Sequence, residues 1–374
     1  PRAPGPPDAH STPPAGPRRS PGHPNAGHAN ADHPNAGQQG LGRRVLLAAL
    51  LGLVVYAALA LHRDARGVLE ALGRIPAWAP LVVCGLSAVN YAVRFPRWQR
   101  YLTLVGSPTA GAASARIYLS GLSLTVSPGK IGEAIKSWEL RRADGTPLAK
   151  SAPIVLAERV TDLFGFLALI VLFGAAQAAR RAPSPVEATV TALALAGGLA
   201  AVALVAWSPA RDTALAFARR LPLVGRRADR ARALFESGAT LLAPRELPRA
   251  TALAALGWGL ECFGAWLLAR SVVPGTVAPE LGFASVGYAF AVSAVAGAVV
   301  VIAPGGLGVT EGLLAALLAR GYAAHGFEPV EAGALALSVT LVVRLCTLWF
   351  GMLVGLVALG LGARASSEAS PADL

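Results

Sequence analysis

This chain contains a series of long, mainly apolar stretches separated by short polar segments, and this pattern restricts the fold more than any other feature. A helix needs about 20 mainly apolar residues to cross a membrane. Of the 374 residues, 54% are hydrophobic and 14% are charged, whereas charged residues make up about a quarter of a soluble protein. We therefore expect an all-α polytopic membrane protein. The apolar stretches occupy residues 45–61, 78–93, 111–126, 163–179, 188–207, 251–270, 284–302 and 332–362.

Composition argues against several other functions. The net charge is +12, but the arginines flank apolar stretches instead of forming a basic and aromatic patch, so we expect no nucleic-acid partner. Cys84, Cys262 and Cys346 lie singly within apolar stretches and show neither disulfide nor metal-ligand spacing. The nucleophile-elbow, zinc-protease, P-loop and dinucleotide-binding motifs are all absent from the sequence. We expect no metal, no cofactor and no enzymatic activity.

Basic residues predict the orientation. Residues 1–40 are rich in Pro, Gly, His and Asn and are expected to form a disordered cytoplasmic tail before the transmembrane domain at 41–364. The loop at 208–249 contains nine arginines and four acidic residues, which places it in the cytoplasm by the positive-inside rule. Cations and aromatics at 94–101 suit the cytoplasmic headgroup layer. Residues 365–374 form a polar tail, and the N-terminus is expected to be cytoplasmic.

Two polar segments share a Pro-Gly motif. Residues 127–133 read Ser-Pro-Gly-Lys-Ile-Gly-Glu, and residues 304–311 read Pro-Gly-Gly-Leu-Gly-Val-Thr-Glu. The stretch before the first motif, 111–126, is about 24 Å long as a helix, short of the roughly 30 Å hydrocarbon core. Broken helices at corresponding places in two halves are typical of transporters with inverted repeats. We predict about six full spans and two re-entrant helical hairpins in inverted-topology repeats.

The same segments supply the candidate site. The N-terminus of a half-helix carries partial positive charge and free N–H groups, so it suits a phosphate. Charged side chains inside a bilayer cost about 2.5–3.5 kcal/mol each and persist where they pair or line a pathway. The candidate substrate-binding or pathway residues are Ser127, Pro128, Gly129, Lys130, Gly132, Glu133, Glu158, Arg159, Asp162, Glu261, Pro304, Gly305, Gly306, Gly308, Glu311 and Arg344.

The charged residues leave alternatives open. Glu158 and Asp162 share a helix face, so Arg159 cannot satisfy both, and we expect cross-helix partners, with Lys130 and Arg344 as candidates. A purely structural ion-pair network is one alternative for the charged set. A membrane transferase in which Glu133 and Glu158 converge on a lipid-linked substrate is another, and a non-transporting scaffold is a third.

In these motifs the chain resembles the transmembrane region of the lysylphosphatidylglycerol synthase family, a flippase-like domain. The resemblance covers about residues 41–364 and rests on the two Pro-Gly segments, the Glu-Arg-Val-Thr-Asp block at 158–162 and Arg344. It implies a translocase of phospholipid or lipid-linked headgroups in the bacterial inner membrane. Its partners would be anionic or zwitterionic lipids, a separate lipid-modifying enzyme and a second copy of the chain. Because the chain ends ten residues after Arg364, we expect it to lack the family's soluble transferase domain.

Overall fold

The computed structural model describes residue 54 and residues 65–127, 132–206, 237–273, 275, 278–299 and 304–368. Within these ranges the chain is helical and contains no strand. Among the described residues, three helical stretches are long and apolar enough to cross a membrane, namely Trp78–Val105, Leu247–Ser271 and Pro329–Gly362. The expected all-α membrane architecture is therefore confirmed for the described part of the chain.

The first half of the described chain combines three long helices with four short ones. The long helix α3 ends at Gly106, whose left-handed conformation lets its N–H bond the carbonyl groups of Leu102 and Thr103. Between α3 and α6 lie α4 and the short 3-10 helix η1, followed by α5 beyond the first Pro-Gly motif. The bounds are α2 Ala65–Gly73, α3 Trp78–Val105, α4 Gly111–Ser120, η1 Gly121–Leu124, α5 Ile135–Asp144, α6 Leu148–Ala178 and α7 Pro185–Ala206.

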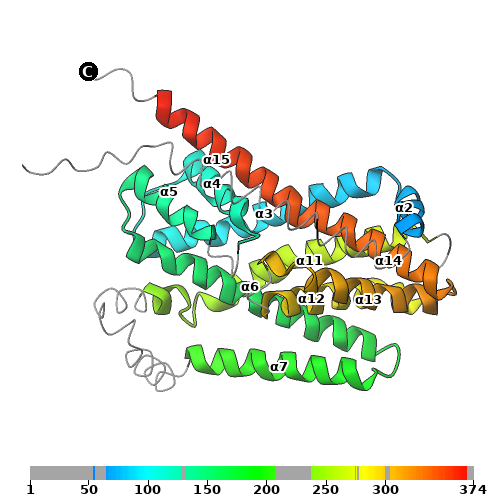
Figure 1. Cartoon of the computed structure of the whole chain (residues 1–374). Helices are drawn as coiled ribbons and strands as arrows, with labels where there is room; N and C mark the ends of the chain where they lie inside the picture. Colours follow the sequence, from blue (N-terminus) through cyan, green and yellow to red (C-terminus); the bar gives the residue numbers. More distant parts are fainter. Residues whose placement is uncertain are drawn as a thin grey trace, which may run out of the picture. The chain divides into compact units, whose positions relative to one another are not determined.

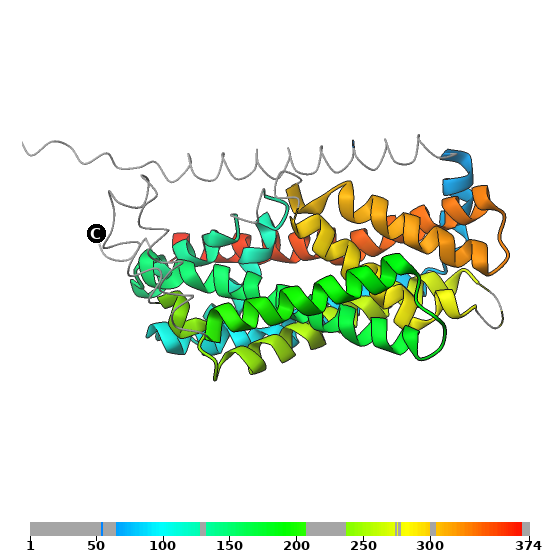
Figure 2. The same cartoon turned by 90° about the horizontal axis from the view of Figure 1, so that it is seen from below.

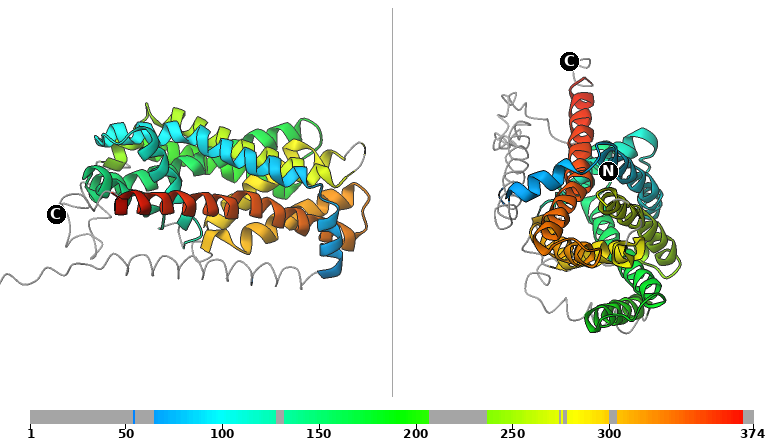
Figure 3. Two further views of the ribbon diagram at one scale, coloured as in Figure 1. Left: turned by 90° about the horizontal axis from the view of Figure 1, so that it is seen from above. Right: turned by 90° about the vertical axis from the view of Figure 1, so that its right-hand side faces the viewer.

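The second half repeats the pattern of a broken helix followed by a long one. A break between α12 and α13 contains the second Pro-Gly motif, and α14 continues through a π-helical turn into α15. Figure 3 shows α14 and α15 following one another along the molecule. The bounds are α11 Leu247–Ser271, η3 Pro279–Leu281, α12 Phe283–Val299, η4 Pro304–Gly306, α13 Val309–Ala324, α14 Pro329–Arg344, η5 Leu345–Trp349 and α15 Phe350–Glu368.

Helix α11 lies at the centre of the packing, in contact with α3, α6 and α12 (Figure 1). Helices α12, α13 and α14 pack in sequence beside it, as Figure 2 also shows. The short helices α4 and η1 pack against α15, where Gly355 has no room for a side chain. A Cβ atom there would lie 2.2 Å from the backbone nitrogen of Ser123. Small residues of this kind allow helix backbones in membranes to approach closely.

The outward faces of these helices are strongly apolar. On α7, which packs against α6, several large hydrophobic side chains are more than half exposed. Similar side chains are exposed on α3, α6 and α15. A soluble monomer rarely exposes so much apolar surface, whereas lipid tails cover it without cost. Exposed examples on α7 are Val186, Leu193 and Leu199.

Several expected elements differ from the observed ones in length. The expected span at 78–93 is the first part of the longer α3, and the last long helix begins at Pro329 instead of Ala332. The first expected span at 45–61, the tail at 1–40 and the basic loop from 208 to 236 lie outside the described residues, apart from residue 54. The number of spans, the re-entrant hairpins and the inverted repeats stay predictions.

Candidate functional site

The second Pro-Gly segment is held by an acid and an arginine. Gly305, Gly306 and Gly308 all have positive φ angles, from 62° to 86°, which only glycine adopts at low cost. This backbone precedes α13, which begins at Val309 with Gly308 as its N-cap. The Glu311 carboxylate accepts a hydrogen bond of 2.7 Å from the Gly308 N–H and so caps the new helix.

Arg344 joins this segment to the long helix that follows it. Its Nε donates to the Glu311 carboxylate, which is fully buried, and its Nη2 donates to the Gly305 carbonyl oxygen at 2.9 Å. A guanidinium group can serve both acceptors because its donors form a rigid fork. The π-helical turn at Leu345–Trp349 begins directly after Arg344. Turns of this type are rare and occur frequently at functional sites.

In the first Pro-Gly segment, a hydrogen bond forms between residues of the segment itself. The Ser127 hydroxyl accepts a hydrogen bond of 2.7 Å from the Gly132 N–H, which joins the two described ends of the segment. Gly132 has no room for a side chain, because a Cβ atom would lie 2.4 Å from the Leu124 Cβ. The α-helix that follows, α5, begins at Ile135. Pro128, Gly129 and Lys130 lie outside the described residues.

The acid that ends the first segment has the same kind of partner as Glu311. Glu133 is buried, and its carboxylate lies 3.2 Å from Nη2 of Arg159 on α6. In both halves, therefore, the acid of the Pro-Gly segment pairs with an arginine on the next long helix. Glu133, Arg159, Glu311 and Arg344 were all candidate site residues, and the structure brings them together in two matching pairs.

Asp162 is the centre of a buried cluster of cations. Its carboxylate lies 2.6 Å from Nη2 of Arg94, 2.9 Å from Nη1 of Arg97 and 3.0 Å from Nη2 of Arg159. Arg97 also donates from Nη1 to the Thr161 hydroxyl at 2.9 Å. One carboxylate shared by three guanidinium groups leaves positive charge in excess at this point. That charge is balanced by other carboxylates nearby.

Two further acids extend the cluster. Glu158 pairs with Lys136 of α5, whose ammonium lies 5.1 Å from the centre of the Trp98 ring. Glu261 of α11 accepts a hydrogen bond of 2.6 Å from the side-chain amide of Asn90 on α3. The buried network therefore connects α3, α5, α6 and α11. Its charged members are the acids Glu133, Glu158, Asp162 and Glu261 and the bases Arg94, Arg97, Lys136 and Arg159.

The second Pro-Gly segment lies against the residue that comes directly before the first one, although the two are far apart in the sequence. A Cβ atom on Gly305 would lie 3.2 Å from the Cα of Val126, the residue before Ser127. Val126 and Leu307 also belong to one small hydrophobic cluster with Leu348 and Met352, which come from the π-helical turn and α15. The chain just before the first Pro-Gly segment therefore contacts the segment that Arg344 holds.

Some buried polar atoms of the network have no hydrogen-bond partner in the described part of the protein. Within the described residues, Nε of Arg94, Nε of Arg159 and Oε1 of Glu158 are buried without a hydrogen-bond partner. Buried polar atoms nearly always have a partner, and exceptions are common where a water or ligand binds. No group of three or more His, Cys, Asp or Glu side chains in the same part of the chain is arranged to hold a metal ion.

The partners of Glu158 and Asp162 correct one expectation. Arg344 was a candidate, but it pairs with Glu311, and the cations that reach the two acids from other helices are Lys136, Arg94 and Arg97. Lys130, the other candidate, lies outside the described residues.

Sequence reasoning missed Arg94 and Arg97 as site residues, because it assigned them with their aromatic neighbours to the headgroup layer. Both are buried in the protein. The signal was the spacing of Asn90, Arg94 and Arg97, which places three polar side chains on one face of an apolar helix.

Comparison with known proteins agrees with the membrane fold. The model of the family described as "Lysylphosphatidylglycerol synthase TM region" matches residues 45–355. The chain belongs to this family. No curated protein matches the chain. Family membership, together with the apolar helices, makes this a multi-pass membrane protein with a lipid-related role.

Proposed function

We propose that this member of the lysylphosphatidylglycerol synthase transmembrane-region family is a lipid translocase that moves a phospholipid or lipid-linked headgroup between leaflets. The observation that carries the proposal is a set of buried acid and arginine pairs that hold the two Pro-Gly segments, together with the contact of Gly305 with Val126, the residue directly before the first segment. A purely structural network would be expected to satisfy its own polar atoms. This one leaves guanidinium N–H groups and a carboxylate oxygen without partners in the described residues.

The chemistry of these groups indicates the headgroup. Guanidinium donors bind phosphate oxygens well, and a free carboxylate oxygen accepts hydrogen bonds from an ammonium group. A site that offers both suits a headgroup with a phosphate and a cationic or hydroxylated end. Anionic and zwitterionic phospholipids are therefore the proposed substrates. They are moved without a covalent change, so the protein acts as a transporter and not as an enzyme.

The matching acid and arginine pairs give the proposal a structural basis for two states. Glu133 with Arg159 and Glu311 with Arg344 fix equivalent segments in the two halves. In an inverted repeat such pairs would open and close from opposite faces of the membrane. We place the protein in the bacterial inner membrane with its N-terminus in the cytoplasm, working beside a separate lipid-modifying enzyme and as a homo-oligomer.

Leaflet exchange of fluorescent phosphatidylglycerol and phosphatidylcholine in proteoliposomes tests this function. The wild-type protein should accelerate exchange over protein-free vesicles, and Glu133→Gln and Arg159→Ala should slow it at least several-fold. Glu331→Gln removes an exposed acid that pairs with Arg74 far from the network and serves as the matched control. Equal exchange in all samples would refute the proposal, and a chemically modified lipid in the mass spectrum would instead indicate a transferase.

A further inference from the structure

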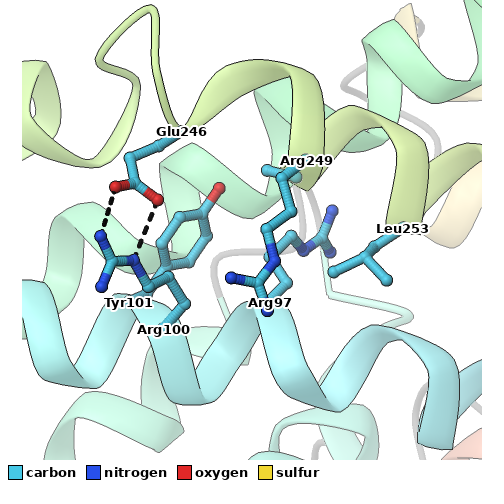
Figure 4. Close-up of a pocket in the computed structure, with 7 residues that line it drawn as sticks. Arg97, Arg100, Tyr101, Glu246, Arg249 and Leu253 are labelled. Atoms are coloured by element: carbon cyan, nitrogen blue, oxygen red, sulfur yellow. Dashed lines mark hydrogen bonds and ion pairs between the residues drawn. The ribbon is translucent and has the colours of Figure 1, made fainter.

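A second polar site lies between the start of α11 and the later part of α3. The pocket is lined by Arg97, Arg100 and Tyr101 of α3 and by Glu246 and Arg249 of the facing segment. Figure 4 shows Arg97 and Arg249 extending toward one another from the two facing helices. Three arginines and one acid therefore surround the same small space, which gives it an excess of positive charge.

The acid in this pocket is already occupied. Glu246 binds Arg100 through both carboxylate oxygens, at 3.0 Å from Nε and 2.5 Å from Nη2 (Figure 4). Arg249 makes no hydrogen bond or ion pair within the part of the chain that the structure describes. Glu246 therefore pairs with Arg100 and does not neutralise the other arginines that line the pocket.

Arg97 is the most informative residue of the pocket. It is only 2% exposed, and its Nη1 bonds Asp162 and Thr161. Its Nε and Nη2 are buried and have no hydrogen-bond partner in the described residues. Leaving charged donors unpaired in a buried place is costly, so they indicate a ligand with acceptor atoms.

We propose that this pocket binds a phosphate group, with one phosphate oxygen accepting from Arg97 and another facing Arg249. The inner part of the pocket has room for about one water-sized atom, which fits a single phosphate oxygen while the rest of the group stays at the mouth. Arginine forks bind phosphate through paired hydrogen bonds. The phosphate belongs either to a phospholipid headgroup or to free phosphate.

Arg97 connects this pocket to the central network, because the same guanidinium group holds Asp162. An occupied pocket would satisfy the remaining donors of Arg97 and fix its position beside Asp162. The site is separate from the Pro-Gly segments and does not depend on lipid movement. Phosphate binding can therefore be measured whether or not the protein is a translocase.

The test uses the full-length protein in detergent and three probes, namely inorganic phosphate, dihexanoyl phosphatidylglycerol and glycerol. Affinity is measured by titration calorimetry, and thermal stability is followed with and without each probe. The variant Arg249→Gln removes an exposed arginine that lines the pocket. The control Arg245→Gln removes an exposed arginine of the same segment that does not line it. Both variants should melt within about 1 °C of the wild type without probe.

We expect a phosphate-bearing probe to bind and to raise the melting temperature, because a ligand of the folded state stabilises it. Arg249→Gln should weaken that binding about tenfold, and Arg245→Gln should leave it unchanged. Binding of the lipid alone would assign the site to a headgroup, and binding of both would assign it to the phosphate group itself. Failure of both to bind, binding of glycerol as tightly as the lipid, or equal weakening in the two variants would overturn the proposal.

Discussion

Asp162→Asn should destabilise the protein more than any exposed charge change, because three guanidinium groups depend on this carboxylate. Asparagine keeps nearly the same shape and one acceptor oxygen but removes the negative charge. The cluster would then hold Arg94, Arg97, Lys136 and Arg159 against three acids. Removing one partner of a buried ion pair costs about 3–5 kcal/mol, since it leaves an uncompensated charge in a medium of low polarity.

This cost is a large fraction of the free energy of unfolding, which is only about 5–15 kcal/mol for a folded domain. At roughly 2 °C per kcal/mol for a chain of this size, the melting temperature in detergent should fall by about 6–10 °C. Glu331→Gln breaks the exposed pair with Arg74, for which the expected cost is about 0–1 kcal/mol. The assay is a thermal melt of both variants beside the wild type. A shift for Asp162→Asn no larger than that for Glu331→Gln would refute the assignment of Asp162 as the centre of the network.

Three further outcomes are expected. Gly355→Ala should lower the melting temperature by several degrees, because the new Cβ would collide with the backbone at Ser123. Gly360→Ala on the same helix has open space around it and should leave the melting temperature unchanged. Equal melting temperatures for the two variants would contradict this packing. Arg344→Lys should slow lipid exchange in proteoliposomes almost as much as Arg344→Ala, since an ammonium group cannot bond both the Glu311 carboxylate and the Gly305 carbonyl as the guanidinium group does. Exchange at the wild-type rate in Arg344→Lys would contradict this role of the guanidinium group. Burial opposes ionisation of Asp144, but hydrogen bonds from hydroxyl groups and a backbone N–H outweigh it and lower its pKa from 3.8 to about 2. The stability that ionised Asp144 gives the folded protein is complete above its ordinary pKa and is lost as the pH falls towards 2. In melts from pH 6 to pH 2, the melting temperature of Asp144→Asn should therefore fall less than that of the wild type. Identical pH curves for the two proteins would contradict this.

The helices and their interruptions could be predicted from the sequence because they depend on local properties. Apolar stretches of sufficient length indicated α3, α11 and the α14 to α15 stretch, and the glycines at 305, 306 and 308 indicated the break before α13. Selection of charged residues inside apolar stretches also identified most of the buried network, because such residues are expensive in a membrane.

The partners of those residues could not be predicted, because they depend on contacts between distant helices. Arg344 was considered for Glu158 and Asp162 but binds Glu311. Arg94 and Arg97 were assigned to the membrane surface because they occur with aromatic residues, a combination that is common there. Their spacing places them on one face of α3, and the packing of α3 against α6 and α11 shows that this face points inward. The π-helical turn after Arg344 likewise has no signal in the residue pattern.

The central claim is that the two Pro-Gly segments form one site for a lipid headgroup, and photocrosslinking tests it most directly. The wild-type protein in vesicles would be irradiated with phosphatidylglycerol carrying a diazirine on its headgroup, and the labelled peptides would be mapped by mass spectrometry. We expect labelling in both 121–134 and 304–311 that falls with excess unlabelled lipid and in Arg159→Ala. Labelling of one segment alone, or labelling confined to lipid-facing helices such as α7 and unaffected by competitor, would contradict the account.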